Sequence, residues 1–381
     1  MEYMAKNIPL WQITTWDKNF NNVDKEWQPK TIKYKYLLSD ELDSLRVDDG
    51  DIRILYTGKD VGYTTEELAG DNISEGEVVS IPWGGIPTVK YHKGKFVTGD
   101  NRIATSNDTS KLTNKYLYYY LQGNIGEIAS YYRGASLKHP CMKDVLKMTI
   151  SYPSVQEQEK ICSQFDMLEW LIEARKQELQ LLDDLIKARF VELFGNPVLN
   201  EKGWESNLLA QLTLKIGSGA TPKGGREAYQ EEGIALIRSM NVYNGKFEYK
   251  DLAHISDEQA AKLDNVIIKE SDVLLNITGA SVARSCVVPN QILPARVNQH
   301  VCIIRCKECI EPIFLNRLLI DDNYQKLLWE IAGSGATREA ITKQQVERLK
   351  IILPPIELQN QFAAFVAQVH KSKLMFQKLH Q

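Results

Sequence analysis

The sequence predicts an α+β protein in which two tandem α/β domains, related by an internal pseudo-two-fold duplication, are separated by long helices that pack as a coiled coil. Three observations lead to this prediction. A heptad seam runs through residues 154–195, the same order of segments occurs on both sides of it, and a second copy of the long helix begins after residue 353. The expected parts are a first domain (1–152), a central helix (153–195), a second domain (196–353) and a short distal helix (354–381).

The first domain is expected to consist mainly of short strands. Its apolar runs are brief, and Gly, Pro and Asp residues interrupt them. Apolar spacing near 115–122 indicates a helix, which is followed by a polar loop and by a last strand near 147–152. The predicted strand runs before this helix are IRILY (52–56), EVVSIPWGG (77–85) and TVKYHKGKFVTGD (88–100).

The central helix is the most strongly patterned part of the chain. Ser154 and Glu157 fit a capping box at its start, while Gly195 and the following Asn196-Pro197 are a stop signal. About 40 residues at 1.5 Å each predict a rod of roughly 60 Å. Its apolar residues alternate at spacings of four and three, which is typical of a helix packed on another helix. The residues expected to pack are Ile161, Phe165, Leu168, Ile172, Leu179 and Leu182.

The second domain repeats the order of the first. IALIR (234–238) corresponds to the first strand run, SDVLLNITGA (271–280) to the second, and one further strand is expected at 296–306. The offset falls to 195 residues for Glu75 and Glu270, so we expect the second copy to be the longer one in its first half. Near the domain ends one offset of 201 relates Gly134 to Gly335, Val145 to Val346, Pro153 to Pro354 and Gln158 to Gln359.

The distal helix supplies a partner for the central one. Under the offset of 201, the central helix would map onto 356–395, whereas the chain ends at Gln381. We therefore expect Ile186 and Leu193 to lack an intramolecular partner at the equivalent position. The distal residues expected to continue the seam are Phe362, Val366, Val369 and Phe376.

Composition favours a soluble, cytoplasmic protein. Hydrophobic residues make up 43% and charged residues 25% of the chain, as in ordinary globular domains. No apolar run reaches the length of a membrane span, and the first residues lack a signal-peptide pattern. The six cysteines have no framework spacing, which suits a reducing compartment.

The charge is unevenly distributed. The net charge is −3 overall, and the central helix carries nine acidic and five basic residues. Residues 88–147 instead hold ten Lys and Arg against four Asp and Glu, with seven tyrosines among them. Basic residues with aromatic ones are typical of a nucleic-acid surface, although some of these tyrosines are expected in the core.

No catalytic or metal site is predicted. The Gly-rich stretch IGSGATPKGG (216–225) lacks the Lys-Ser/Thr of a phosphate-binding loop. His300, Cys302, Cys306 and Cys309 resemble a zinc cluster, but Cys302 lies in a core-like strand and no second ligand pair has zinc spacing.

Six stretches form a recognisable set of motifs, namely YPSVQEQEKI (152–161), ARFVELFGNPVLNEKGWE (188–205), IGSGATPKGG (216–225), SDVLLNITGASVAR (271–284), ARVNQHV (295–301) and LPPIELQNQF (353–362). They resemble one known family, the specificity subunits of Type I restriction–modification systems. The match covers most of residues 130–365, and its duplicated order makes it specific.

The resemblance implies a fold and a function. The fold is two α/β target-recognition domains whose central and distal helices pack antiparallel. The function is that of a non-catalytic subunit that reads double-stranded DNA, each domain recognising one half of a bipartite asymmetric site. The implied partners are two methyltransferase subunits and the restriction and translocase subunits. S-adenosylmethionine, ATP and Mg²⁺ would be used by those partners, and no cofactor by this chain.

Candidate DNA contacts follow from residue type and position. Arg and Lys suit guanine and phosphate, and Thr suits phosphate. Asn298 and Gln299 are equally compatible with a structural turn, and Trp83 with the core. The candidates are Lys90, Lys93, Lys95, Arg102, Arg133 and Lys138 in the first domain and Thr221, Lys223, Arg226, Arg238, Arg284 and Arg338 in the second.

Two alternatives remain at this point. A self-contained methyltransferase or nuclease would need its own catalytic motif, which is not evident in the sequence. A silent, truncated specificity cassette is suggested by the short distal helix. If the central helix acts as a spacer, four added residues would lengthen it by about 6 Å, close to two base steps.

Overall fold

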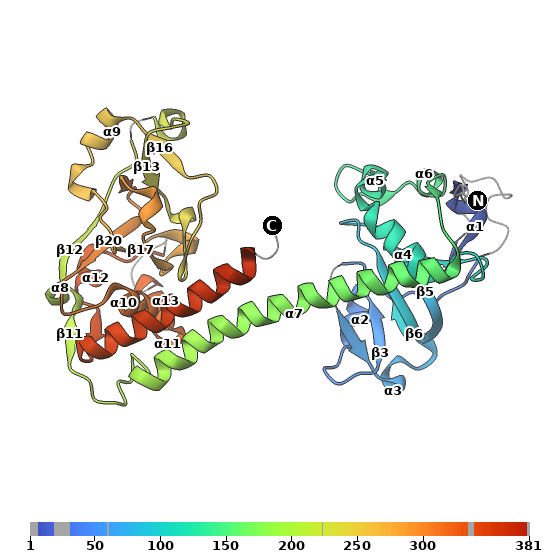
Figure 1. Cartoon of the computed structure of the whole chain (residues 1–381), viewed down its shortest axis with the longest axis horizontal. Helices are drawn as coiled ribbons and strands as arrows, with labels where there is room; N and C mark the ends of the chain where they lie inside the picture. The colour runs from blue at the N-terminus through green and yellow to red at the C-terminus, as the bar shows by residue number, and fades with distance from the viewer. Residues whose placement is uncertain (1–6, 19–30, 59–60, 223, 334–338, 379–381) are drawn as a thin grey trace. The chain divides into compact units, whose positions relative to one another are not determined.

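The computed structural model describes residues 7–18, 31–58, 61–222, 224–333 and 339–378, with the backbone only at 226, 228 and 376–378. The chain forms two compact units, residues 1–174 and 175–381, so that one long helix contributes to both (Figure 1). Each unit has its own sheet and hydrophobic core. Among the described residues, no helix is long and apolar enough to cross a lipid bilayer.

The first unit is built on a six-stranded sheet in the order β2-β7-β5-β6-β3-β4. Neighbouring strands are antiparallel except β3 and β6, which are parallel. The strands predicted at 52–56, 77–85 and 88–100 are confirmed as β3, β5 and β6. The strand bounds are β2 (Thr14–Trp16), β3 (Ile52–Leu55), β4 (Gly62–Thr64), β5 (Ser74–Pro82), β6 (Lys90–Thr98) and β7 (Asn101–Ser106).

Helix α4 (Asn114–Gly123) packs on this sheet and closes its main core. Two short strand pairs, β1 with β10 and β8 with β9, complete the unit. The remaining bounds are β1 (Ile8–Pro9), α1 (Leu10–Ile13), α2 (Ser39–Leu45), α3 (Glu66–Ala69), α5 (Ile125–Ser130), β8 (Tyr132–Arg133), β9 (His139–Pro140), α6 (Met142–Val145) and β10 (Thr149–Ile150).

The second unit contains a four-stranded sheet, β12-β20-β17-β18, and a three-stranded sheet, β16-β13-β19. The single strand predicted at 296–306 is two strands, because residues 298–300 form a turn between β19 and β20. The strands are β11 (Ser206–Leu208), β12 (Thr213–Ser218), β13 (Ile234–Ile237), β14 (Val242–Tyr243), β15 (Lys246–Phe247), β16 (Ala253–Ile255), β17 (Val273–Asn276), β18 (Ser285–Val287), β19 (Ala295–Val297), β20 (Val301–Cys306) and β21 (Lys350–Ile352).

Helices cover the four-stranded sheet of the second unit and enclose the larger of its two cores. The smaller core joins the faces of the two sheets. The helices are α8 (Leu209–Leu212), α9 (Asp257–Ala261), α10 (Pro312–Leu319), α11 (Asp322–Gly333), α12 (Lys343–Glu347) and α13 (Ile356–Lys378).

The duplication extends further toward the N-terminus than the sequence comparison indicated. Thr14 Oγ1 donates to the carbonyl of Leu10 at 2.5 Å, and Thr213 Oγ1 donates to that of Leu209 at 2.8 Å. Both pairs close a one-turn helix and are related by an offset of 199. The expectation that the second copy is the longer one in its first half holds only after residue 75, because the offset first falls from 199 to 195 and only then rises to 201.

The long helix α7 (Val155–Phe194) confirms the helix predicted at 154–195. In the second unit, α13 packs antiparallel against the C-terminal half of α7 (Figure 1). The Phe194 and Phe362 ring centroids are 5.6 Å apart, and Lys373 forms an ion pair with Asp183. Residues near the start of α13 thus contact residues near the end of α7, as in an antiparallel pair.

The antiparallel pairing corrects one prediction. Ile186 was expected to lack an intramolecular partner, yet it is 6% exposed and belongs to the same core as Phe362, Val366 and Val369. Leu193 is half-buried against that core. The start of α13 lies beside the end of α7, so an offset that matches start with start assigned the wrong partners.

The seam is only partly covered. Leu182 packs against the core of the second unit, and Ile161 and Leu179 are half-buried. Phe165 stacks on Tyr119 of α4 at 4.9 Å between ring centroids. The packing expected at Leu168 and Ile172 is not observed among the described residues, since these side chains are 52% and 54% exposed. The side chain of Phe376 lies outside the described residues.

Candidate nucleic-acid interface

Two loops of the first unit lie together and form what we call the first loop pair, residues 83–87 after β5 and residues 134–138 between β8 and β9. The amide of Gly85 donates to the carbonyl of Lys138 at 3.2 Å. At its base, His139 Nδ1 is 2.7 Å from the Trp83 carbonyl oxygen, and the two rings are 5.4 Å apart. The pair is therefore held by backbone and ring contacts, and its tips are left free.

The second unit has an equivalent arrangement, the second loop pair, formed by residues 278–282 after β17 and residues 339–340 before α12. The amide of Gly279 donates to the carbonyl of Glu339 at 2.9 Å. The next contact, from the amide of Ile341 to the carbonyl of Ile277, is 2.8 Å long. Lys138 and Glu339 are 201 residues apart, so the duplication includes the joining of these loops.

A polar network adjoins the second loop pair at the turn between β19 and β20. Thr278 Oγ1 is 2.5 Å from His300 Nδ1, and Gln299 Nε2 is 3.1 Å from His300 Nε2. The Thr221 hydroxyl donates to the amide oxygen of Gln299. Asn298 is buried and its side chain accepts from the His300 amide at 3.0 Å, so it stabilises the turn. The Gln299 side chain is exposed and can face a ligand.

Arg102 has a different environment from the one predicted for a DNA contact. Its side chain is 1% exposed and forms ion pairs with Asp17 and Asp100. Its guanidinium also lies 4.6 Å from the centre of the half-buried Trp83 ring. Burial raises the pKa of Asp17, and the charge of Arg102 opposes that rise. Arg102 therefore supports the first loop pair from within and is not available to DNA, which corrects the prediction.

The other predicted cations of the first unit differ in availability. Lys90 donates to the carbonyls of Tyr56 and Gly58 and so anchors a loop. Lys95 forms an ion pair with Glu66 at 3.0 Å. Lys93 is 72% exposed and has a longer contact of 3.9 Å with Glu77. Lys138 is exposed in the first loop pair, and Arg133 is exposed beside it in β8, 4.0 Å from the Asp144 carboxylate. Of these residues, Arg133 and Lys138 are best placed to meet a polyanion.

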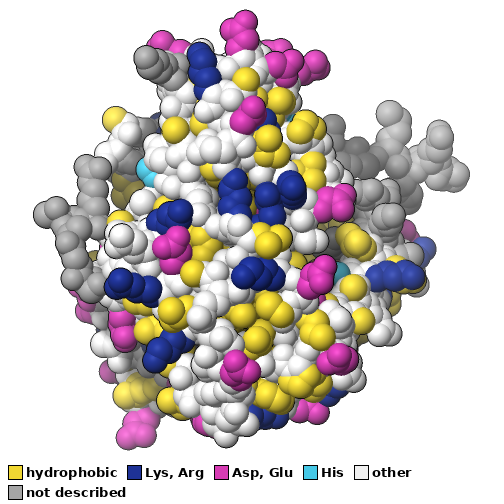
Figure 2. Space-filling model, turned by 90° about the vertical axis from the view of Figure 1, so that its left-hand side faces the viewer, with side chains coloured by type: hydrophobic (Ala, Val, Ile, Leu, Met, Phe, Trp, Pro, Cys, Tyr) yellow, Lys and Arg dark blue, Asp and Glu magenta, His cyan; other side chains and the backbone are white. Residues whose placement is uncertain are grey.

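In the second unit, Arg238 and Arg284 each lie over an aromatic ring. Arg238 is 5.3 Å from the Tyr229 centroid and donates to the Asp251 carbonyl, while Arg284 is 4.6 Å from that of Tyr243. Figure 2 shows several Lys and Arg side chains near the middle of one face of this unit, with Asp and Glu side chains interspersed among them and toward the edges. Lys223, Arg338 and the side chain of Arg226 lie outside the described residues.

The tyrosines of α4 are engaged within the first unit. The hydroxyl of Tyr119 donates to Asp166 on α7 at 2.7 Å, and Lys115 pairs with the same carboxylate at 2.6 Å. The Tyr118 hydroxyl donates to Glu169 at 3.1 Å. Burial and the charge of Glu169 raise the pKa of Tyr118 to about 12. These side chains fasten α4 to the acidic long helix, which the composition alone did not reveal.

A buried glutamine joins each long helix to its unit. In the first unit, Gln158 accepts from the Thr113 amide at 2.9 Å and donates to the carbonyls of Lys111 and Pro153. Thr113 is the residue that caps the start of α4. Gln158 is 0% exposed, so its amide replaces water for three backbone groups.

Gln359 repeats this arrangement in the second unit. It accepts from the amide of Glu311, the capping residue of α10, at 2.9 Å. It donates to the carbonyls of Pro354 at 2.7 Å and Cys309 at 3.4 Å. Sequence comparison paired the two glutamines but gave no indication of this role.

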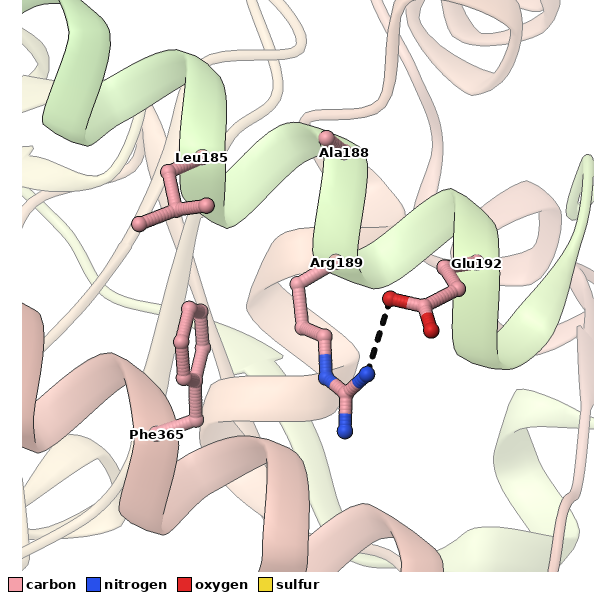
Figure 3. Close-up of a pocket in the computed structure, with 5 residues that line it drawn as sticks. All are labelled: Leu185, Ala188, Arg189, Glu192 and Phe365. Atoms are coloured by element: carbon pink, nitrogen blue, oxygen red, sulfur yellow. Dashed lines mark hydrogen bonds and ion pairs between the residues drawn. The ribbon is translucent and has the colours of Figure 1, made fainter.

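Helices α7 and α13 line a groove of about 540 Å³ in the second unit (Figure 3). Leu185 and Ala188 of α7 and Phe365 of α13 line it. Arg189 and Glu192 lie at one end of it and are joined by an ion pair of 2.8 Å. The lining is mostly apolar with one charged pair, which suits an amphipathic helix of another protein.

Three of the four residues considered for zinc have other surroundings. His300 contacts Thr278, and burial raises the pKa of the Cys302 thiol to about 12 and that of the Cys306 thiol likewise. Within the described residues, no group of three or more His, Cys, Asp and Glu side chains is arranged to hold a metal ion.

Comparisons with known proteins match both halves of the chain to one family. The family described as Type I restriction modification DNA specificity domain matches residues 31–183 and again residues 201–381. The chain is 21% identical over 287 residues to the Type I restriction enzyme EcoBI specificity subunit of Escherichia coli. It is 25% identical over 295 residues to the MjaIX specificity subunit of Methanocaldococcus jannaschii.

The coverage of these relatives is partial. The matches include 68% and 70% of this chain but 59% and 65% of the two relatives. Among solved structures, the crystal structure of a Type-I restriction-modification system S subunit from M. genitalium aligns with a TM-score of 0.62 at 14% identity, over 99% of this chain and 93% of that one. This likeness shows a shared fold.

Proposed function

The chain belongs to the family of Type I restriction modification DNA specificity domains, and on that premise we propose that it is the DNA-reading specificity subunit of a Type I restriction–modification complex. The family resemblance inferred from the sequence is thereby confirmed. The observation that carries the proposal is the repeated family match together with the repeated loop pairs. Each unit presents a joined pair of loops at the corresponding place in its fold.

The two loop pairs support a site made of two unlike halves. The first loop pair carries Ile86, Leu137 and Lys138, whereas the second carries Ala280 and Ser281 beside the exposed amide of Gln299. Side chains of different size and hydrogen-bonding capacity select different base edges. A duplicated fold with different loops would therefore read a bipartite, asymmetric sequence.

We propose that catalysis belongs to partner proteins and that this chain is non-catalytic. Methyl transfer from S-adenosylmethionine and ATP- and Mg²⁺-dependent cleavage would occur in methyltransferase, restriction and translocase subunits. The groove lined by Leu185, Ala188 and Phe365 supports docking of a methyltransferase subunit on the helix pair. Leu185→Lys places a charge in that groove and should reduce co-purification with the methyltransferase subunit.

A matched control is available on the same unit. Leu199 is 67% exposed and does not line the groove, so Leu199→Lys should leave co-purification unchanged. Docking at the groove would be contradicted if both variants lost the partner equally, or if neither variant lost it.

The test of the function is the methylation pattern of a methylation-free host that expresses this chain with its methyltransferase partner. We expect a new split motif of two unlike halves, with methyladenine in both. Soluble, co-purifying subunits that add no methylation would contradict the proposal and favour a silent cassette. Methyl transfer by the isolated chain would contradict the non-catalytic assignment.

A further inference from the structure

The first loop pair holds two large apolar side chains in solvent. Ile86 is 72% exposed and Leu137 is 56% exposed. Single exposed apolar residues are common on protein surfaces. These two differ because they lie on separate loops that are joined to each other, by the bond from the Gly85 amide to the Lys138 carbonyl.

Close packing between the loops fixes the Leu137 tip. A Cβ atom on Gly84 would lie 3.2 Å from Leu137 Cδ2, so the leucine rests against the opposite loop. Gly134 has a φ of +137°, and a Cβ atom there would lie 2.3 Å from the Leu137 carbonyl oxygen, so this turn requires glycine. Leu137 would therefore lose little conformational entropy when this loop binds a ligand.

The surroundings of the tips are cationic. Residues 83–87 and 131–144 contain Arg133, Lys138 and Lys143 against one acidic residue, Asp144. The Arg133 side chain is 64% exposed, and its guanidinium lies 4.0 Å from the Asp144 carboxylate. A ligand that fits this surface has negative charge at its edge and apolar groups within reach of two branched side chains. DNA has both, as phosphates and as the methyl groups of thymine in the major groove.

We propose that Ile86 and Leu137 are specificity-determining residues of the first unit, which contact thymine methyl groups while Arg133 and Lys138 hold the backbone phosphates. This inference rests on the proposed function. The equivalent loop of the second unit has Ala280 and Ser281 in place of a large apolar tip. Methyl reading by an apolar tip is therefore assigned to one half of the site only.

The test measures binding of the full chain, in complex with its methyltransferase partner, to oligonucleotides in which single thymines are replaced by deoxyuridine. This replacement removes only the methyl group. Wild-type complex should lose roughly fourfold in affinity at one or two positions of one half-site, as expected for one buried methyl group. Ile86→Ala or Leu137→Ala should bind thymine DNA more weakly and should lose the difference between thymine and uridine.

Controls separate the possible failures. Leu199→Ala, an exposed leucine outside both loop pairs, should retain the wild-type difference, and unchanged melting temperatures show that all variants fold. Equal wild-type affinity for thymine and uridine at every position would overturn the inference, as would an undiminished difference in both variants or a site without thymine. Sequence-specific binding in those cases leaves the proposed function standing. Absence of any sequence-specific binding by the wild-type complex overturns both.

Discussion

Replacement of Gln359 by alanine should loosen the joint between α13 and the second unit. The Gln359 side chain is fully buried and bonds three backbone groups, namely the Glu311 amide and the carbonyls of Pro354 and Cys309. Alanine removes the side-chain amide that all three groups bond. Leaving a buried polar group unpaired costs about 1–3 kcal/mol. Water can enter the space left by the side chain and offset part of this, so we expect a loss of about 3 kcal/mol.

Thermal unfolding of the full chain is measured by calorimetry, and hydrogen exchange is measured at the Glu311 amide. For a unit of this size, about 3 kcal/mol corresponds to a decrease in Tm of roughly 6–12 °C. The Glu311 amide should exchange faster because it loses its acceptor. Gln368→Ala, on an exposed position of the same helix, is the matched control and should change Tm very little.

A charged near-isostere gives an independent check. Gln359→Glu keeps an acceptor for the Glu311 amide but cannot donate to the two carbonyls while it is ionised. Burial beside carbonyl oxygens raises the pKa of such a carboxyl in the folded state above its unfolded value. The variant should therefore be least stable above the folded pKa and should recover stability as the pH falls toward the unfolded value. The reasoning would be refuted if Gln359→Ala had the same Tm as the Gln368→Ala control. It would also be refuted if the stability of Gln359→Glu did not depend on pH.

Four further outcomes are expected. Asp183→Asn should lower the free energy of unfolding in urea by about 1 kcal/mol, because Lys373, whose side chain is 17% exposed, loses its partner. Lys373→Met should leave this free energy nearly unchanged, and equal losses in the two variants would contradict this view. Lys138→Ala should lower the slope of log affinity against log salt by about 1 if that side chain meets a phosphate, and an unchanged slope would exclude the contact. Since burial raises the pKa of the Cys302 thiol to about 12, mass spectrometry should find it unmodified by a thiol reagent at pH 8 in native chain and modified after unfolding. Four residues inserted into α7 should lengthen the spacer of the methylated motif by about two base pairs, and an unchanged spacer would show that the helix does not set it.

Local patterns were sufficient for the secondary structure of much of the chain. The heptad spacing and the stop at Gly195 predicted α7, because helix periodicity and termination depend on neighbouring residues only. The runs at 52–56, 77–85 and 88–100 became strands for the same reason. The LWQIT stretch at residues 10–14 and LAQLT at 209–213 show that a further repeat was present in the sequence and was missed.

The candidate site was less predictable than the fold. Arg102 was selected for its charge, but its role depends on Asp17, which is 85 residues away in the chain and supplies its ion pair. The tyrosines of α4 were selected for their composition, yet Asp166 and Glu169 on α7 bind their hydroxyl groups. Residue type states which contacts a side chain can make, and only the packed structure states which of them are used.

The sequence by itself determined the duplication, the two α/β units, the long helices and the family, because all of these are encoded in periodicity, order and motif. Tertiary structure alone decided which residues of α13 face which residues of α7, and therefore the burial of Ile186. It also decided the joining of the loop pairs and the engagement of Gln158 and Gln359. The physical reason is that these contacts join residues distant in the chain, whose proximity follows from packing and leaves no local pattern in the sequence.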